Sequence, residues 1–345
     1  ATYDPHTPPL NAMALGFYQQ NEAGLRAIGH GGDTIFFHSD MHLFLDKGVG
    51  LFVSVNSAGS VSGLGTLLLR GELASTFAER DFSETALQPE ETLPTAQEHG
   101  EKIAGVYEVS RSAITNFLTM TRFLGQMKVT VSEEGELLVP FAGGVTRWRE
   151  VEPFVWRKKD SWERLSATFD ENGRVDQLSF EPFSPFMTYS PAPWYRSSAL
   201  LSPLLGLALG ALALTALFWP VRAIVRWRYK TAFALTGKEA FGYRFARVAA
   251  VAVLAYLGAW AALFTALQAD LSTLTPAFDG NVRIMQVAQI VLYIGLAATL
   301  WNAMLVWRGA GSWLAKVWSL VIPAAIAVVI WMAAIGGLLS FSLTY

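Results

Sequence analysis

The sequence has 345 residues, with 26 Lys and Arg against 28 Asp and Glu, no Cys, and 52% hydrophobic against 16% charged residues. Without Cys, the chain cannot form a disulfide-stapled scaffold, a Cys-ligated zinc site or a CxxC redox site. Residues 1–196 carry a net charge of −9 and residues 197–345 a net charge of +7. The basic residues of the second half stand in short runs between apolar stretches, which argues against nucleic-acid binding. We therefore expect an acidic water-exposed half joined to a basic membrane half.

Residues 1–88 have the pattern of antiparallel strands followed by a helix. Short apolar or alternating runs between turn residues predict four strands, at residues 14–19, 25–29, 34–45 and 50–56. Leu69, Leu73 and Phe77 stand four residues apart and predict an amphipathic helix over residues 66–80 with these side chains on one face. Such a set of elements forms only part of a domain.

The sequence around the second and third strands resembles a known family. Gly24-Leu25-Arg26-Ala27-Ile28-Gly29-His30-Gly31-Gly32-Asp33-Thr34 is followed by Phe36-Phe37-His38-Ser39 and by Gly48-Val49-Gly50-Leu51-Phe52-Val53. This pattern is similar to the last part of the serine β-lactamase/penicillin-binding-protein fold, and looks most like its class C-like esterases and D-amino-acid peptidases. In that family a strand beside the active site carries Lys-Thr-Gly or a His-x-Gly variant, which His30-Gly31-Gly32 matches.

The resemblance implies four site residues, which are His30, Gly31, Gly32 and Asp33. The backbone N–H of Asp33 would donate to the oxyanion, and His30 would point into the site towards the substrate. The two glycines lack a Cβ, so a substrate can lie close to the strand. The family's Ser-x-x-Lys and Tyr-x-Asn motifs have no match in residues 1–345. We therefore expect this sequence to be a piece without its natural N-terminus, and the nucleophile to lie outside it. A glycine-relieved β-bulge is the plainer interpretation of the glycines.

A metal site is the alternative for the histidines of this region. His38 and His42 share a strand face with Asp40 by the period of two, and His30 would have to converge on them from another strand. Surface or hydrogen-bonded histidines are the simpler interpretation. We expect no metal and no cofactor.

Residues 89–99 are polar, acidic and contain Pro, which predicts a linker. Residues 100–193 predict a small antiparallel β-barrel, with hairpins at residues 128–140 and 165–180 and further strands at 105–107, 148–152 and 154–158. The opening Gly105-Val106-Tyr107 and the turn at residues 170–173 resemble a lipocalin-like module that often follows such hydrolase domains. Trp148, Trp156 and Trp162 suit an aromatic core better than a ligand cleft. The cations of this region suit a solvated face better than an anion site; they are Arg147, Arg149, Arg157, Lys158 and Lys159.

Residues 194–345 predict four transmembrane helices, at about residues 197–221, 248–269, 284–307 and 317–342. Each is long enough to cross about 30 Å of hydrocarbon. The first and third connections are rich in Lys and Arg, and the second carries Asp270 and Asp279 against Arg283. The positive-inside rule then places residues 1–196 outside the cytoplasm. Gln286, Gln289 and Asn302 are the main polar residues of the spans, and helix-packing contacts are their simplest role. The lack of ionisable residues in the spans disfavours a transporter.

These observations predict a multidomain α+β and membrane all-α protein. Its parts are the C-terminal part of a serine β-lactamase-like α/β domain (1–88), a linker (89–99), a β-barrel (100–193) and a four-helix transmembrane bundle (194–345). The predicted function is that of a fragment of a membrane-anchored serine hydrolase in a bacterial inner membrane. Its expected partners are the lipid bilayer and a peptide or small-molecule substrate, with no nucleic acid. The alternative is a non-catalytic membrane sensor or ligand-binding protein with a hydrolase-like remnant.

Overall fold

The computed structural model describes residues 10–34, 36–57, 64–82, 91–141, 144–181, 183–269 and 273–344, with the side chains of residues 64–68 left out. Contacts between Cα atoms divide the chain into two compact units. The first holds Ala1–Arg111 and Gly125–Ala192, and the second holds Ser112–Leu124 and Pro193–Tyr345. A short segment from the middle of the sequence therefore belongs with the C-terminal helices.

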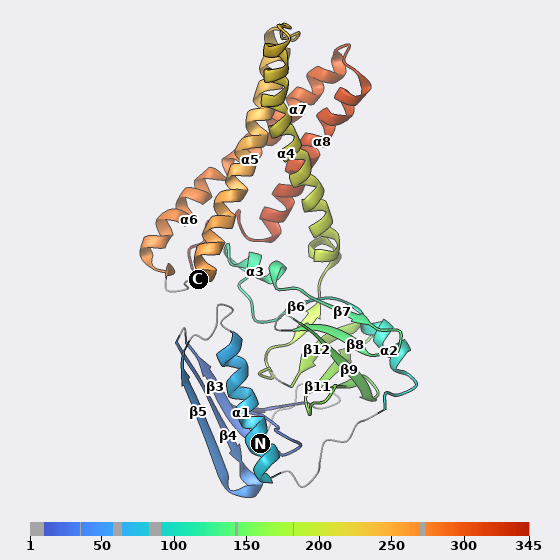
Figure 1. The fold of residues 1–345 in the computed structure, drawn as a ribbon, viewed down its shortest axis with the longest axis vertical. Coiled ribbons are helices and arrows are strands. Elements are labelled where there is room, and N and C mark those ends of the chain that lie inside the picture. Colours follow the sequence, from blue (N-terminus) through green and yellow to red (C-terminus); the bar gives the residue numbers. More distant parts are fainter. Residues whose placement is uncertain are drawn as a thin grey trace. The chain divides into compact units, whose positions relative to one another are not determined.

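A five-stranded antiparallel sheet opens the first unit, and a helix covers one of its faces (Figure 1). The strands follow one another in the order β1-β2-β3-β4-β5, and helix α1 packs on β4 and β5. Their bounds are β1 Met13–Ala14, β2 Phe17–Gln19, β3 Ile28–Asp33, β4 Phe37–Phe44, β5 Val49–Asn56 and α1 Leu64–Phe82. A 3-10 turn, η1 (Leu45–Lys47), joins β4 to β5, and Gly48 completes it with φ of 63°. The predicted helix and antiparallel order are present, but the single strand expected at residues 14–19 is two strands, β1 and β2, so the sheet has five strands instead of four.

Two further details of this prediction were wrong. The second strand was expected at residues 25–29, but Glu22 and Leu25 bond each other across a tight turn in which Ala23 and Gly24 have positive φ. The strand therefore begins at Ile28 and contains the whole His-Gly-Gly-Asp sequence. Leu69 and Leu73 were expected on the packing face of the helix, but they are 44% and 43% exposed.

The face of α1 that packs on the sheet is built from small residues. Ala74 and Ala78 are fully buried, and Arg70 precedes them with the same spacing of four residues. The short alanine side chains let the helix lie close to the strands, and Phe44 of β4 packs against Phe77 and Phe82 beside them. This close approach brings the Arg70 side chain onto the sheet.

A closed eight-stranded antiparallel barrel forms the rest of the first unit, as predicted. Its strands are ordered β10-β11-β12-β13-β6-β7-β8-β9. Trp148 and Trp156 are buried in its core, which confirms the aromatic-core interpretation for these two side chains. Trp162 packs instead beside Ala23 and Ala27 of the sheet region. The bounds are β6 Gly105–Val109, β7 Met127–Val131, β8 Leu137–Phe141, β9 Gly144–Glu152, β10 Val155–Lys158, β11 Arg164–Phe169, β12 Val175–Phe180 and β13 Tyr189–Pro191.

The stretch expected to be a linker, residues 89–99, is partly helical. Helix α2 (Ala96–Ile103) begins within it, and Ile103 is fully buried in the barrel core. The buried carboxylate of Glu150 on β9 accepts bonds from Thr95 Oγ1 at 2.9 Å and His99 Nδ1 at 2.6 Å. Burial of Ile103 and these polar contacts fix the segment on the barrel, which composition alone does not reveal.

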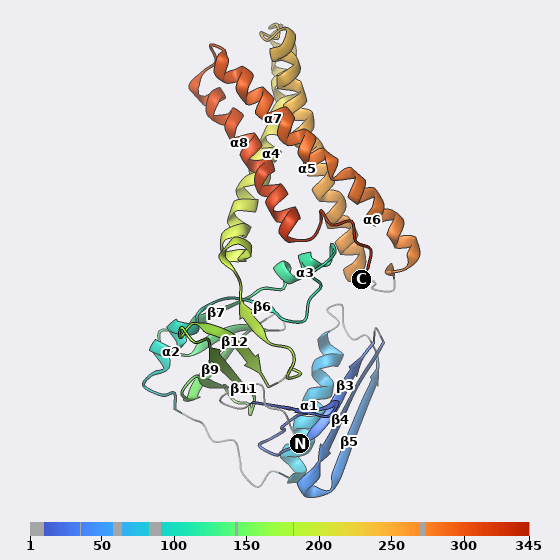
Figure 2. The ribbon, with the colours of Figure 1, turned by 180° about the vertical axis from the view of Figure 1, so that it is seen from behind.

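The second unit has four apolar helical segments long enough to cross a membrane, in agreement with the predicted spans. They cover Trp194–Arg228, Gly237–Ala269, Pro276–Arg308 and Trp313–Ile335. The third is broken at Gln289 into two helices, α6 and α7, which the hydropathy pattern did not indicate. The elements are η2 Trp194–Arg196, α4 Ser198–Arg228, α5 Gly237–Ala269, α6 Pro276–Ala288, α7 Ile290–Arg308 and α8 Trp313–Ile335 (Figure 2).

Residues 112–124, from the connection between β6 and β7, pack against these helices. The segment includes α3 (Thr119–Leu124), and Phe117 is 2% exposed within the core of the bundle. Asn116 Nδ2 donates to the carbonyl of Thr344 at 2.6 Å, and Ser340 Oγ donates to the carbonyl of Thr115 at 2.7 Å. Gln286 of α6 donates to the carbonyl of Ser340 at 3.1 Å. Gln286 therefore binds α6 to the C-terminal segment, whereas the role expected for it was a contact between helices.

Candidate functional site

The His-Gly-Gly-Asp sequence forms the second half of β3, and alternation places its residues on opposite faces of the sheet. Gly31 faces α1, because a Cβ added to it would lie 3.3 Å from Arg70 Nη2. Asp33 shares this face, and its carboxylate contacts the same arginine. His30 and Gly32 therefore lie on the face without the helix, where both are exposed. The His30 ring lies 5.0 Å from the Tyr18 ring, centroid to centroid.

One edge of this half-strand has no neighbouring strand in the part of the chain that the structure describes. β2 pairs with β3 only at Ile28 and Gly29, whereas β4 pairs with β3 from Ile28 to Asp33. The Gly31 N–H donates to Tyr18 Oη at 2.7 Å, so it points away from β4. In an antiparallel strand alternate residues direct their N–H groups to the same side. The Asp33 N–H therefore also points towards this edge.

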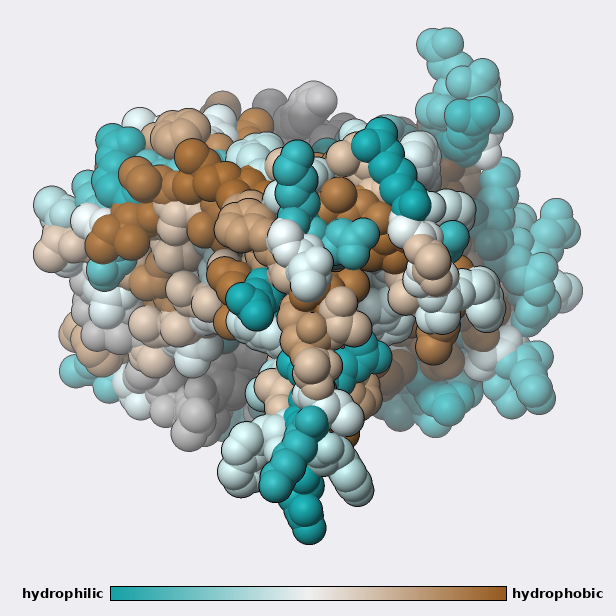
Figure 3. Space-filling view, turned by 90° about the horizontal axis from the view of Figure 1, so that it is seen from above, coloured by the Kyte–Doolittle hydropathy of each residue, from teal (hydrophilic) through white to brown (hydrophobic). Residues whose placement is uncertain are grey.

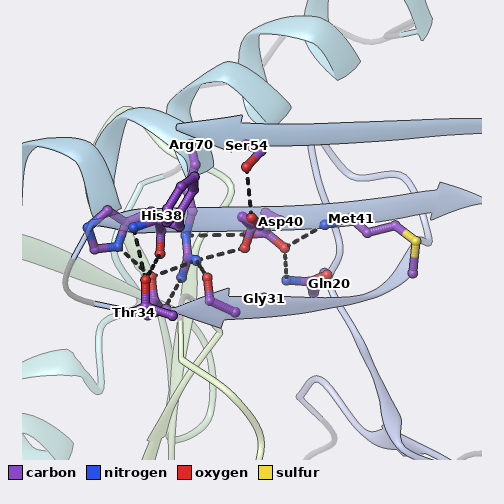
Figure 4. A network of polar contacts seen from close by, with 12 residues as sticks. Gln20, Gly31, Thr34, His38, Asp40, Met41, Ser54 and Arg70 are labelled. Carbon is purple, nitrogen blue, oxygen red and sulfur yellow. Dashed lines mark hydrogen bonds and ion pairs between the residues drawn. The ribbon is translucent and has the colours of Figure 1, made fainter. Parts of the chain in front are cut away.

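Two side chains, Arg70 and His38, contact the Asp33 carboxylate. Figure 4 labels both of them beside the end of β3. Arg70 Nη1 and Nη2 lie 2.8 and 3.0 Å from its two oxygens, and His38 Nδ1 lies 2.7 Å from Oδ1. The same guanidinium donates to the carbonyl oxygens of Gly32 at 3.2 Å and Ser39 at 2.8 Å. These contacts fix the end of β3 against β4 and α1. They give the Asp33 side chain a structural role and leave its N–H as the group directed to the edge.

A second polar cluster lies further along the same face. Asp40 Oδ1 accepts from Gln20 Nε2 at 3.1 Å and lies 3.6 Å from His42 Nε2. Burial alone would raise the pKa of Asp40, but His42, Gln20 and Arg70 together hold that pKa below its usual range. The His42 ring is almost completely buried between this carboxylate and Glu22, whose Oε1 lies 3.9 Å from Nδ1.

Glu22 is the most perturbed carboxyl group of the cluster. Burial raises its pKa to about 7, against the opposing effects of the hydrogen bond from Ser75 and the nearby His42. Ser75 Oγ of α1 donates to Glu22 Oε2 at 2.6 Å, so this contact also joins the helix to the sheet. A carboxyl group that titrates near neutrality is suited to proton transfer. It lies beneath α1, however, on the face opposite to His30.

The structure brings together some of the residues named from the sequence. His38, Asp40 and His42 share one face as expected, and His30 lies on the other face. Among the described residues, no group of three His, Asp or Glu is arranged to hold a metal ion. Glu22 and Arg70 were missed, and the only signal for Arg70 was its spacing of four residues from Ala74 and Ala78. Arg147 and Arg149 of the barrel form ion pairs with Glu136, and Lys158 pairs with Glu163.

No protein-family model and no curated protein matches this chain. Among solved structures, the chain is similar to SurE with D-Leu at 17% identity and a TM-score of 0.29, covering 52% of this chain and 39% of that chain. A second SurE structure is 16% identical with a TM-score of 0.27, covering 52% and 37%. The chain thus spans less than two fifths of the length of either structure, and likeness at this level decides nothing about activity.

Proposed function

We propose that this chain is part of a membrane-anchored serine hydrolase of the β-lactamase/penicillin-binding-protein type, with β3 beside the active site. The observation that carries the proposal is the edge of β3 after Gly29. There the Asp33 N–H points away from β4, and Gly31 and Gly32 add no side chains of their own, although Tyr18 Oη accepts from the Gly31 N–H. This is the arrangement that an acyl-transfer enzyme needs for a substrate bound along a strand and for an oxyanion donor.

The proposed reaction is acyl transfer to water through a serine ester. A serine from outside residues 1–345 attacks the acyl carbon, and the Asp33 N–H donates to the oxyanion that forms. Collapse of the tetrahedral intermediate expels the alcohol or amine, and water then releases the acid. His30 lies with Gly32 on the open face, where its ring can donate to the substrate. A histidine is a weaker anchor for carboxylates than lysine at neutral pH, which favours ester, amide or peptide substrates.

The charges of the membrane half favour an extracytoplasmic location for this reaction. The α4–α5 and α7–α8 connections are basic, so the positive-inside rule favours the cytoplasmic side for them. The sheet and the barrel would then be extracytoplasmic, and a bacterial inner membrane is the setting that suits such an enzyme. Substrates held near the bilayer, such as envelope peptides, fit this anchoring.

The proposal is tested by labelling the native membrane protein with a fluorophosphonate probe and reading its intact mass and labelled residue. We expect a labelled species heavier than this chain, with the probe on a serine followed three residues later by lysine. A native species that has the mass of this chain and takes no label would contradict the enzyme proposal. That result would favour the alternative, a membrane-anchored ligand-binding protein.

A further inference from the structure

The connection between α4 and α5 concentrates positive charge. Between residues 222 and 247 there are seven cations and one acid, Glu239. The cations are Arg222, Arg226, Arg228, Lys230, Lys238, Arg244 and Arg247. No ion pair joins any of them to a carboxylate within the described parts of the chain. Seen from above in Figure 3, hydrophilic side chains extend from the helix ends between apolar ones.

Three of these arginines converge on a pair of aromatic rings. The Arg226 guanidinium of α4 lies 4.9 Å from the centre of the Phe233 ring, and that of Arg244 of α5 lies 5.4 Å from the same ring. Phe233 lies 5.4 Å from the Tyr243 ring, and the Arg247 guanidinium lies 3.4 Å from the centre of Tyr243. Stacking on rings orders guanidinium groups from two helices while leaving their N–H donors free for an anion.

Arg247 is the arginine of this cluster that most needs a neighbouring anion. It is 9% exposed, and the hydrogen bond from its Nη1 goes to the neutral carbonyl of Tyr243 at 2.9 Å. A buried cation without a counter-ion is costly, and in proteins such a charge is normally compensated. Because no carboxylate pairs with Arg247 in the part of the chain that the structure describes, we look to another molecule for the compensating charge.

The position of the cluster at the ends of two candidate membrane spans points to a lipid. Trp227 and Tyr229, which follow Arg226 at the end of α4, are 80% and 72% exposed. Exposed Trp and Tyr at the end of a span lie at the level of the lipid headgroups. We propose that Arg226, Arg244 and Arg247 bind the headgroup phosphate of an anionic phospholipid. This site is independent of the proposed hydrolase activity, because it lies in the other unit of the chain.

The test uses the full chain, purified in detergent and freed of lipid, and titrated with phosphatidylglycerol or phosphatidylcholine. Native mass spectrometry then counts the bound lipids. We expect one phosphatidylglycerol to bind in preference to phosphatidylcholine. The double variant Arg226→Gln/Arg244→Gln should weaken this binding by about tenfold or more, because it removes two charge-assisted contacts. Both side chains lie at the surface or partly exposed, so the variant should fold.

The matched control is Arg308→Gln/Lys316→Gln, which removes the same charge from the α7–α8 connection. We expect this control to keep the affinity of the parent chain. An equal loss in both double variants would mean unspecific attraction between charges and would overturn the proposal. Equal binding of the two lipids would also overturn it. The last experiment is a competition with inorganic phosphate. Displacement of phosphatidylglycerol by millimolar phosphate would assign the site to a soluble anion and overturn the proposal.

Discussion

Phe117, from the connection between two barrel strands, stacks on Trp260 of a membrane helix with ring centres 5.5 Å apart. Phe264 and Phe278 complete the aromatic surroundings at 5.9 and 6.3 Å. The segment around Phe117 also bonds the C-terminal residues Ser340 and Thr344. The chain therefore uses a loop of the barrel as part of the core of its membrane unit.

Replacing Phe117 with Ala should destabilise the membrane unit. Loss of a buried aromatic side chain typically costs about 3 kcal/mol or more, because a cavity remains. The measurement is the thermal unfolding midpoint of the full chain in detergent. Ile114→Ala is the matched control in the same segment, since Ile114 is 70% exposed and should be replaceable without a shift. Equal shifts for the two variants would mean that Phe117 does not pack as described.

Arg70→Met should release the end of β3 from α1. The substitution keeps much of the side-chain length but removes the guanidinium from the buried Asp40 and from Asp33, which keeps its contact with His38. Removing the cation beside a buried carboxylate such as Asp40 costs about 3 kcal/mol, whereas the contact with the more exposed Asp33 contributes about 1 kcal/mol or less. Hydrogen exchange of the β3 and β4 amides in the full chain reports this loss as faster exchange. Arg80→Met serves as control, because the ion pair of Arg80 within the described residues is with its neighbour Asp81 in solvent. This variant should leave exchange unchanged. Unchanged exchange in Arg70→Met would refute the structural role of Arg70.

Glu22 should make the first unit less stable as pH rises. Its pKa is raised to about 7 in the folded chain from an ordinary value of 4.5. Between these values the unfolded chain loses the proton first, so stability falls as pH rises through this window, by at most about 3 kcal/mol. Asp40 acts in the opposite direction, but only at pH values below its ordinary pKa of 3.8.

Glu22→Gln tests this pH dependence. The variant should flatten the fall in stability between pH 4.5 and 7 and should be more stable than the parent chain at pH 8, because its amide carries no charge. Hydrogen exchange of β2 and β3 amides at several pH values gives the measurement. Glu72→Gln, on the exposed side of α1, should follow the parent chain throughout. A parallel curve for Glu22→Gln would show that another group causes the dependence.

Elements whose structure depends on neighbouring residues in the chain could be predicted from the sequence. Long uncharged stretches indicated the four spans, and turn residues such as Asp170 to Gly173 placed the barrel hairpins correctly. Period-two alternation also put His38, Asp40 and His42 on one face.

Contacts between residues far apart in the sequence could not be predicted. Phe117 stands in a loop without periodicity, and its partner Trp260 lies far along the chain. Arg70 was not singled out from the sequence, because Leu69, Leu73 and Phe77 indicated a different apolar face of the helix. The break at Gln289 lies beside the polar Gln286 and Gln289, but polar residues within an apolar stretch do not by themselves predict the end of a helix. For Phe117 and Arg70 the deciding partner is brought close only by the folded chain.

The most direct measurement of the central proposal is the rate at which a fluorophosphonate labels the native membrane protein carrying Gly32→Val. A Cβ at Gly32 meets nothing within 4 Å and points to the open face of β3, so the variant should fold but obstruct the substrate. Gly71→Val on α1 is the matched control, because a Cβ there also meets nothing within 4 Å. We expect labelling to slow by about tenfold or more only in Gly32→Val, because the reacting groups are misplaced. Equal labelling rates in the two variants and the parent protein would contradict the placement of the active site beside β3.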